Sequence, residues 1–440
     1  MKAVILAAGE GRRMNNPDGP PKILLDLYGQ TLLEHHLNAL SSLGVTEFVI
    51  VTGRQCNAIE QYAERKRLFR RFNLSLVAND RWPEGNGSSI LAAQACVNED
   101  RFLVVMGDHL FDPESLRGFL KVRGEFVGVF DSEPRYVDTN EATKAASRHG
   151  YVVALGKELA EFKYVDTGMF ICAPRLFPFI EQCLAEGQGT FNEVKRRWIA
   201  SGNILHIFDC RGAFWMDVDT EEDLVKARKV VRNRLIKPRD GWVARYLNRP
   251  LSTRLSPIIA RTSATPNQIS LVVFSLGVLA AHLFAQGEYS LSVAGGMLAQ
   301  MSSVLDGVDG EVARLKFRAS PYGSWLDSVL DRWADALLIF GVVYGSWKVI
   351  GSAWIWMLGF LALAGSLILS YTESRYESSF HRAMPHSGSR LPATRDVRLF
   401  LIMIGGLAYQ LPLALAAIGI LSTAEVLRRL VSGAKDPQQV

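Results

Sequence analysis

Residues 306–331 read DGVDGEVARLKFRASPYGSWLDSVLD and lie between apolar stretches that are long enough to cross a bilayer. Asp306 and Asp309 are three residues apart, and Asp327 and Asp331 are four apart. Residues at these separations share one face of a helix, so two antiparallel helices joined by a short turn can direct all four carboxylates at one point. Burying unpaired carboxylates is costly, which leaves protonation or a divalent cation as the remedy. Hard oxygen ligands suit Mg²⁺, Mn²⁺ or Ca²⁺.

Small residues accompany these acids. Gly310, Ala313 and Gly323 leave an open approach to the helix surface, as a bulky ligand beside a metal needs. The whole pattern, D-x2-D-G-x2-A-R-x8-G-x3-D-x3-D, is met at every fixed position and resembles the signature of the CDP-alcohol phosphotransferases. Chance Asp–Gly turns and an ion path lined by intramembrane acids are the two alternatives.

The resemblance covers about residues 240–432. It implies that Asp306, Asp309 and Asp327 bind one or two Mg²⁺ or Mn²⁺ ions together with the phosphates of a CDP-alcohol. It also implies that Asp331 is both a metal ligand and the catalytic general base for the acceptor hydroxyl. The residues that it implies for the cytidine and the adjoining phosphate are Gly310, Ala313, Gly323 and Arg314.

Arginines are frequent between residues 373 and 398. Arg375, Arg395 and Arg398 are candidates for holding the phosphate of an acceptor, because guanidinium groups bind phosphate through paired hydrogen bonds. Solvated charge on the cytosolic side explains most of the five arginines in this segment.

Hydropathy indicates six membrane spans in the second half of the chain. The segments are 267–285, 289–314, 322–346, 351–371, 395–410 and 411–430. The loops on one side carry nearly all the basic residues, whereas those on the other side carry only Lys348. Because positive charge favours the cytosol, we expect a multi-pass protein of the cell membrane, with its N-terminal domain and C-terminus in the cytoplasm.

The first half has the pattern of an α/β domain. Strand-like segments at 47–53, 102–108 and 164–172 alternate with helical patterns such as that of 31–44. We expect a Rossmann-like, three-layer α/β fold with a largely parallel sheet, fused to an all-α domain of six transmembrane helices. Ligands bind such sheets beyond the carboxyl ends of the strands, which is where Asp108 falls.

Motifs along this half resemble those of the nucleotidyltransferases that join nucleoside triphosphates to sugar or alcohol phosphates. They are LAAGEGRRM at 6–14 followed by PK, NGSS at 86–89, GDH at 107–109 and WMDVDT at 215–220. A strand that feeds a glycine-rich, basic loop brings backbone N–H groups and positive charge close to phosphate, which agrees with the resemblance.

This second resemblance implies a set of site residues. For nucleotide binding they are Ala8, Gly9, Gly11, Asn86 and Gly87. Catalytic positive charge comes from Arg13 and Lys22, and Mg²⁺ is bound by Asp108 with either Asp217 or Asp219. Lys157 stands where such enzymes often hold the phosphate of the acceptor, and His109 is either a packing residue or a substrate contact.

Composition excludes several classes of protein. The five cysteines show no CxxC spacing, and the N-terminal apolar run is shorter than a signal peptide requires, so we expect reduced thiols and a cytosolic first half. Eleven basic residues between 226 and 261 face a single acid, and this run leads into apolar sequence, which favours an amphipathic helix on the bilayer over nucleic-acid binding. We expect four segments: a cytosolic nucleotidyltransferase domain at 1–225, a basic linker with the amphipathic helix at 226–262, the six-span domain at 263–432, and a tail at 433–440.

The order of the two modules narrows the function. The fusion resembles the family of bifunctional inositol-1-phosphate cytidylyltransferases and di-myo-inositol phosphate phosphate synthases. That resemblance implies CTP and inositol 1-phosphate as substrates, CDP-inositol as the intermediate, a compatible-solute precursor as the product, and a homodimer formed through the membrane domain. Three alternatives stay open: headgroup transfer to a lipid acceptor, a nucleotide-regulated cation pathway, and a choline-phosphate-type cytidylyltransferase, for which no aromatic cage can be assigned.

Overall fold

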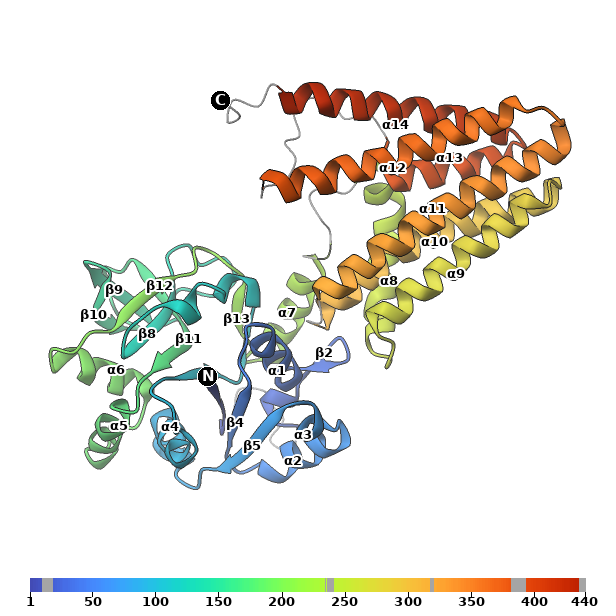
Figure 1. Ribbon diagram of the computed structural model, residues 1–440. Coiled ribbons are helices and arrows are strands. Elements are labelled where there is room, and N and C mark those ends of the chain that lie inside the picture. The colour runs from blue at the N-terminus through green and yellow to red at the C-terminus, as the bar shows by residue number, and fades with distance from the viewer. Residues whose placement is uncertain (10–18, 234, 236–240, 317–319, 381–392, 435–440) are drawn as a thin grey trace. The chain divides into compact units, whose positions relative to one another are not determined.

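The computed structural model describes residues 1–9, 19–233, 235, 241–316, 320–380 and 393–434 (Figure 1). The chain divides into two compact units, Met1–Val231 and Arg232–Val440. The domain limits expected from the sequence stay predictions. Two predicted site residues, Gly11 and Arg13, lie outside the described residues.

Within its described residues, the first unit is built on a nine-stranded sheet. In spatial order the strands are β5 (Asn73–Ala78), β4 (Glu47–Thr52), β1 (Lys2–Ala7), β6 (Phe102–Met106), β11 (Tyr164–Cys172), β8 (Phe126–Asp131), β12 (His206–Asp209), β10 (Tyr151–Gly156) and β9 (Lys144–Arg148). Strands β5, β4, β1 and β6 are parallel to one another, as predicted. Beyond β6 the prediction of a largely parallel sheet is wrong, because β11 runs antiparallel to β6 and β8, and β10 runs antiparallel to β12 and β9. Only β8 and β12 are parallel in this part of the described sheet.

Both faces of β1, β4 and β6 are buried, which is why these strands read as continuous apolar runs. Along β1, Val4 and Leu6 pack against Ile90 of α4 (Asn86–Ala92), and the alternating Ala3 and Ile5 are also fully buried. The remaining helices of this unit are α1 (Leu32–Ser42), α2 (Cys56–Arg65), α3 (Leu68–Arg71), α5 (Leu176–Ala185), α6 (Phe191–Ala200) and α7 (Glu221–Asn233). Helix α1, which the sequence predicted, begins at a capping box in which Thr31 and Glu34 each bond the other's backbone N–H.

The second unit is helical. Its elements are the π-helical turn η7 (Ala244–Asn248), α8 (Arg249–Ala260), α9 (Pro266–Ala285), α10 (Tyr289–Leu315), α11 (Pro321–Ile350), α12 (Trp354–Phe380), α13 (Arg395–Leu407) and α14 (Leu411–Ala434). Helices α9, α11, α12 and α14 are long and apolar enough to cross a membrane. Four of the six predicted spans are therefore candidate spans by length and composition. The other two predicted spans, at α10 and α13, stay predictions.

A buried carboxylate fastens α8 to α10. Glu311 has no exposed surface, and its Oε1 accepts hydrogen bonds from Arg249 Nη1 at 2.6 Å and from Ser252 Oγ at 2.7 Å. Its Oε2 accepts a third bond from Ser256 Oγ at 2.6 Å. These partners, all from α8, satisfy the buried charge, while Ile258 of the same helix stays 65% exposed. Helix α8 thus combines a fixed polar side with exposed apolar residues, as an interfacial helix does.

Small residues let α9 and α11 pack closely. A Cβ placed on Gly345 would lie 1.9 Å from the carbonyl oxygen of Phe284, and one on Gly341 would lie 2.2 Å from that of Ala281. At Gly277, in contrast, an added Cβ would meet Ala334 Cβ at an ordinary 3.4 Å. Close backbone approach at small residues is the usual basis of helix association in membranes, so α11 depends on its two glycines to stay against α9.

We expect Gly345→Ala to lower stability by more than about 1 kcal/mol, because the methyl group must push the backbone of α9 away. The measurement is the midpoint of thermal unfolding of the purified protein in detergent. Gly277→Ala is the matched control in the same helix pair and should leave that midpoint unchanged or slightly raised. Equal midpoints for the two variants would contradict the close packing of α9 and α11.

Candidate active sites

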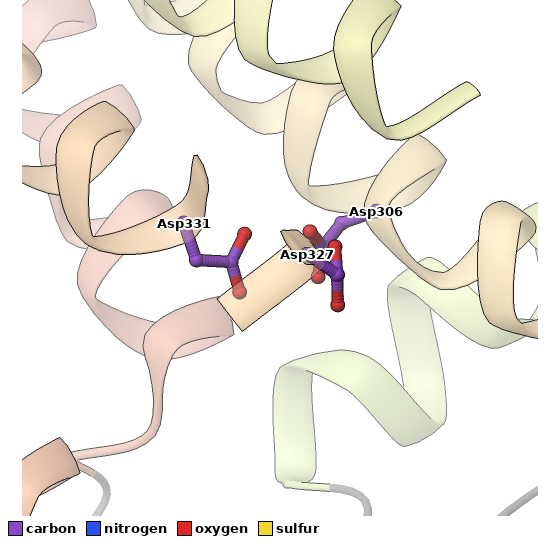
Figure 2. Close-up of side chains that lie close together, drawn as sticks. All are labelled: Asp306, Asp327 and Asp331. Carbon is purple, nitrogen blue, oxygen red and sulfur yellow. The ribbon is translucent and has the colours of Figure 1, made fainter. Parts of the chain in front are cut away.

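Three of the four predicted acids meet in the second unit. Asp306 comes from α10, and Asp327 and Asp331 come from α11, one turn apart. One carboxylate oxygen from each lies within 4.8 Å of the others. Figure 2 shows the three side chains directed toward one another. We call these three residues the acid cluster.

The fourth acid, Asp309, is 6% exposed and lies beside Asp327, but it also has partners outside the acid cluster. Its Oδ2 accepts a hydrogen bond from Ser270 Oγ on α9, and its Oδ1 accepts one from the backbone N–H of Gly310. Asp309 therefore lies on the predicted helix face but is held by α9 in this structure. Its predicted role as a metal ligand stays a prediction.

An arginine from a third helix completes the acid cluster. Arg395 Nη1 lies 2.7 Å from Asp306 Oδ1 and 3.0 Å from Asp331 Oδ1. Its Nε donates to Oδ1 of Asp335 at 3.0 Å, and Asp335 Oδ2 accepts from Arg398 Nη2 at 2.9 Å. Sequence reasoning missed Asp335, although it follows Asp331 by the same four residues that separate Asp327 from Asp331.

The other predicted residues of this unit lie on α10, α11, α12 and α13. A Cβ on Gly310 would meet only the Arg314 side chain, at 3.4 Å, so the surface there is open, as predicted. Ala313 is half-buried one turn later. Gly323 is less open, because a Cβ there would lie 3.1 Å from Ser320 Oγ and 3.2 Å from Asn267 Oδ1.

The remaining predicted arginines differ in their surroundings. Arg314 donates from Nη2 to the carbonyl oxygen of Leu235 at 3.2 Å. Arg375 is exposed on α12, whereas Arg398 is buried and also donates from Nη1 to the Ala393 carbonyl at 3.1 Å. Arg398 is thus occupied by protein groups here, and Arg375 faces solvent.

The first unit holds a second acidic site, next to a cavity of about 650 Å³. Asp108 follows the carboxyl end of β6, as the sequence predicted, and His109 begins β7 (His109–Phe111). Strand β7 pairs antiparallel with β13 (Trp215–Asp217), and this pairing sets Asp217 opposite His109. Five predicted residues line the cavity: Asn86, Asp108, Lys157, Asp217 and Asp219.

Charges at this site are closely linked. Lys22 Nζ lies 2.5 Å from Asp219 Oδ1 and 4.0 Å from Asp108 Oδ2. His109 Nδ1 donates to Asp108 Oδ1 at 2.8 Å, and its ring stacks on Trp215. His109 also lines the cavity, so both readings left open by the sequence, packing and access to substrate, agree with its position.

Burial and neighbouring charges set the protonation of these groups. Burial raises the pKa of Asp108, but the hydrogen bond from His109 and the charge of Lys22 outweigh it and bring the pKa to about 2. Burial lowers the pKa of His109, but the adjacent Asp108 reverses this and raises the pKa overall. Burial also raises the pKa of Asp217. Asp108 is therefore a carboxylate at neutral pH, as a metal ligand must be.

Backbone geometry explains the NGSS motif. Asn86 Oδ1 accepts a hydrogen bond from the N–H of Phe191 at 2.7 Å, which ties α4 to α6. A Cβ on Gly87 would lie 2.6 Å from the Gly189 carbonyl oxygen, so a larger residue cannot replace it without a shift. Ala8 is buried at the end of β1, and Gly9 is exposed beyond it. Their predicted contact with nucleotide stays a prediction.

A buried ion pair on the cavity wall escaped the sequence analysis. Lys195 of α6, 2% exposed, bonds to the carboxylate of Asp166, which is 9% exposed. Both residues line the cavity together with Lys157. The only sequence signal was a charged residue inside the apolar strand 164–172.

The donor chemistry of both sites fits a divalent cation. Each presents at least two carboxylates within a polar, partly enclosed environment, and Mg²⁺ and Mn²⁺ prefer such oxygen ligands. In the acid cluster, a cation would offset the mutual repulsion of three carboxylates. The residues present therefore suit the metal that the sequence predicted.

Comparisons with known proteins agree with this division. Residues 3–200 match the MobA-like NTP transferase domain, and residues 263–427 match the CDP-alcohol phosphatidyltransferase family. The chain is 39% identical to a bifunctional IPC transferase and DIPP synthase of Rubrobacter xylanophilus, over 98% of this chain and 96% of that protein. It is 36% identical to the protein of the same description from Archaeoglobus fulgidus, over 92% of this chain and 78% of that one. The chain therefore belongs to the family of bifunctional IPC transferase and DIPP synthase proteins.

Proposed function

We propose that this protein makes CDP-inositol in its first unit and consumes it in its second. In the first reaction, a phosphate oxygen of inositol 1-phosphate attacks the α-phosphorus of CTP and pyrophosphate leaves. In the second, a hydroxyl of another inositol 1-phosphate attacks the inositol-bearing phosphorus of CDP-inositol and expels CMP. The product is di-myo-inositol phosphate phosphate. The observation that carries the proposal is the presence of two separate acidic sites in a chain related to such bifunctional proteins along nearly its whole length.

Phosphoryl chemistry of this kind needs charge neutralisation and positioning more than a covalent nucleophile. In the first unit, Lys22 would move from Asp219 to the phosphates of CTP, and Lys157 would hold the phosphate of the acceptor. When bound, Mg²⁺ or Mn²⁺ at Asp108 with Asp217 or Asp219, and at Asp306, Asp327 and Asp331, would neutralise phosphate charge. Which of the two aspartates completes the first site is open.

In the second unit, Asp331 would accept the proton of the attacking hydroxyl, and Gly310 and Ala313 would give the cytidine room beside the acids. Asp309 would join the metal ligands if it left Ser270. Arg375, Arg395 and Arg398 remain the proposed phosphate-binding residues for the acceptor. Exposed Arg375 is free to do so as it stands, whereas Arg398 would first have to leave Asp335.

Membrane orientation follows from the distribution of charge. We propose that both sites face the cytoplasm, where CTP and inositol 1-phosphate are available, because the basic residues gather on that side. Exposed Trp242, Tyr246 and Ile258 would place α8 and the turn before it in the bilayer surface. We further propose a homodimer formed through the membrane-spanning helices.

The two half-reactions should be separable by mutation. Lys22→Met should slow CDP-inositol formation by about 10²-fold or more and leave CMP release from added CDP-inositol intact. Asp331→Asn should do the reverse, slowing the second step by about 10²- to 10⁴-fold so that CDP-inositol accumulates. Mass spectrometry of products from CTP and inositol 1-phosphate is the measurement. If either variant stops both reactions, the division into two sites is wrong. A lipid-soluble product would show that the acceptor is a lipid and not inositol 1-phosphate.

Lys157 should affect one substrate only. We expect Lys157→Ala to raise the KM for inositol 1-phosphate in the first reaction by about tenfold, since each charge-assisted hydrogen bond contributes about 1.5–3 kcal/mol. The KM for CTP should stay within a factor of two of the wild type, a margin of about 0.4 kcal/mol. Exposed Lys66→Ala is the matched control. Initial rates at varied concentrations of each substrate give both KM values. A selective rise in the KM for CTP would contradict the prediction and place Lys157 at the nucleotide.

The acid cluster should bind Mn²⁺ through Asp327. Asp327→Asn removes a carboxylate ligand, so the Kd for Mn²⁺ should rise by at least about tenfold. Glu373→Gln, which alters an acid paired with Arg429 in the same unit, is the control and should not change it. Calorimetry on the purified protein measures both. Unchanged affinity in Asp327→Asn would remove this residue from the proposed metal site.

A further inference from the structure

Arg395 binds two of the three carboxylates that a cation at the acid cluster would use. Its Nη1 lies within hydrogen-bond distance of both Asp306 Oδ1, at 2.7 Å, and Asp331 Oδ1, at 3.0 Å. These two residues supply two of the three clustered carboxylates. A guanidinium group and a divalent cation are both positive and repel each other at such short range, which sets Arg395 and the cation in competition for Asp306 and Asp331.

The opposite edge of the same guanidinium has a separate anchor. Arg395 Nε donates to Asp335 Oδ1 at 3.0 Å, and Asp335 is not a member of the acid cluster. Asp335 is 6% exposed, and Arg398 fixes its other oxygen at 2.9 Å. Arg398 is in turn held by the Ala393 carbonyl. Loss of the Nη1 contacts therefore leaves Arg395 tied to the site through Nε.

Space for an anion adjoins this arginine. Arg395 and Asp306 line a cavity of about 240 Å³ whose wall also includes Asn248, Ser303 and Thr394. Ser303 and Thr394 offer hydroxyl groups, while Asn248 donates to Ser303. The wall also holds Arg249, which is paired with Glu311, and Asp396, which accepts from the Ala244 N–H. An Nη1 group released from the acid cluster would thus remain beside a polar cavity of a size that suits a small phosphorylated molecule.

We propose that Arg395 is a built-in competitor of the divalent cation, retained by Asp335, and that cation and acceptor oxyanion therefore bind cooperatively. A cation at the acid cluster displaces Nη1, which then donates to the oxyanion in the cavity. An oxyanion that captures Nη1 frees Asp306 and Asp331 for the cation, and linkage requires the two effects to be equal. Asp335 is a positioning residue in this scheme. The inference rests on the proposed function only for the identity of the oxyanion, the phosphate of inositol 1-phosphate.

Mn²⁺ binding tests the competition without any turnover. Calorimetry is done on the full-length protein in detergent. An Asp108→Asn background removes Mn²⁺ binding at the first unit. Binding that remains after Asp327→Asn is added does not belong to the acid cluster and is subtracted. Sulfate or inositol 1-phosphate should each tighten Mn²⁺ binding, by a factor within the usual range for coupled sites of about 5- to 150-fold. Arg395→Gln should bind Mn²⁺ more tightly than the parent without any anion, and anions should no longer change its affinity.

Two further variants isolate the anchor. Asp335→Asn should weaken Mn²⁺ binding and reduce the response to anions, because the displaced guanidinium loses the partner that retains it. Arg395→Lys keeps the charge with a single donor group, so competition should persist while the anion response falls. Arg428 pairs with Glu425. Arg428→Gln is therefore the control, and its Mn²⁺ affinity should equal that of the protein with Arg395 and Asp335 intact. Thermal unfolding shows which variants are folded, and Arg395→Lys carries the test if Arg395→Gln is not.

The outcomes separate this inference from the proposed function. Unchanged or weaker Mn²⁺ binding in folded Arg395→Gln, or an anion response that survives in it, would overturn the competition. If neither anion tightens Mn²⁺ binding to the parent, the inference fails while the product analysis still decides the function. If sulfate acts and inositol 1-phosphate does not, the competition stands and the proposed acceptor is wrong.

Discussion

Repulsion among closely spaced carboxylates is the constraint on which the second unit depends. Asp306, Asp327 and Asp331 approach within 4.8 Å in a helical unit that includes four apolar candidate spans, where ions are poorly solvated. The fold supports this arrangement by two means. Close packing at Gly341 and Gly345 holds α11 against α9, and a cation must supply the missing positive charge at the acids. In this structure the guanidinium of Arg395 supplies it.

The first unit also brings carboxylates together, and it does so with the strands of an α/β sheet. Asp108 lies beyond the carboxyl end of a parallel strand, and the pairing of β7 with β13 brings Asp217 and Asp219 to it from more than 100 residues away. Lys22 and His109 keep Asp108 ionised. Both units therefore place carboxylates where phosphate must bind and pair them with a basic side chain, which a metal or a substrate can displace. A chain with two such sites suits consecutive reactions through a diphosphate intermediate.

Local periodicity explains how much of the structure the sequence could predict. The acid cluster follows from three- and four-residue spacings, and α1 follows from the helical pattern of 31–44, because both depend on neighbours along one helix. The direction of β11 and the partners of Arg398 depend on how distant elements pair, which spacing does not encode. Asp335 was missed for the same reason: its bonds to Arg395 and Arg398 exist only once α13 packs beside α11. Hydropathy predicted the four long apolar helices α9, α11, α12 and α14, because their apolar residues run through the whole helix.

The most direct test of the account is to locate Mn²⁺ by anomalous scattering in crystals of the protein grown with the ion. The account predicts a peak about 2.0–2.6 Å from carboxylate oxygens of Asp306, Asp327 and Asp331, the span of distances usual for Mg²⁺ and Ca²⁺, with Arg395 Nη1 withdrawn and its Nε still on Asp335. A map without a peak at these carboxylates, in crystals that show Mn²⁺ at Asp108, would contradict it.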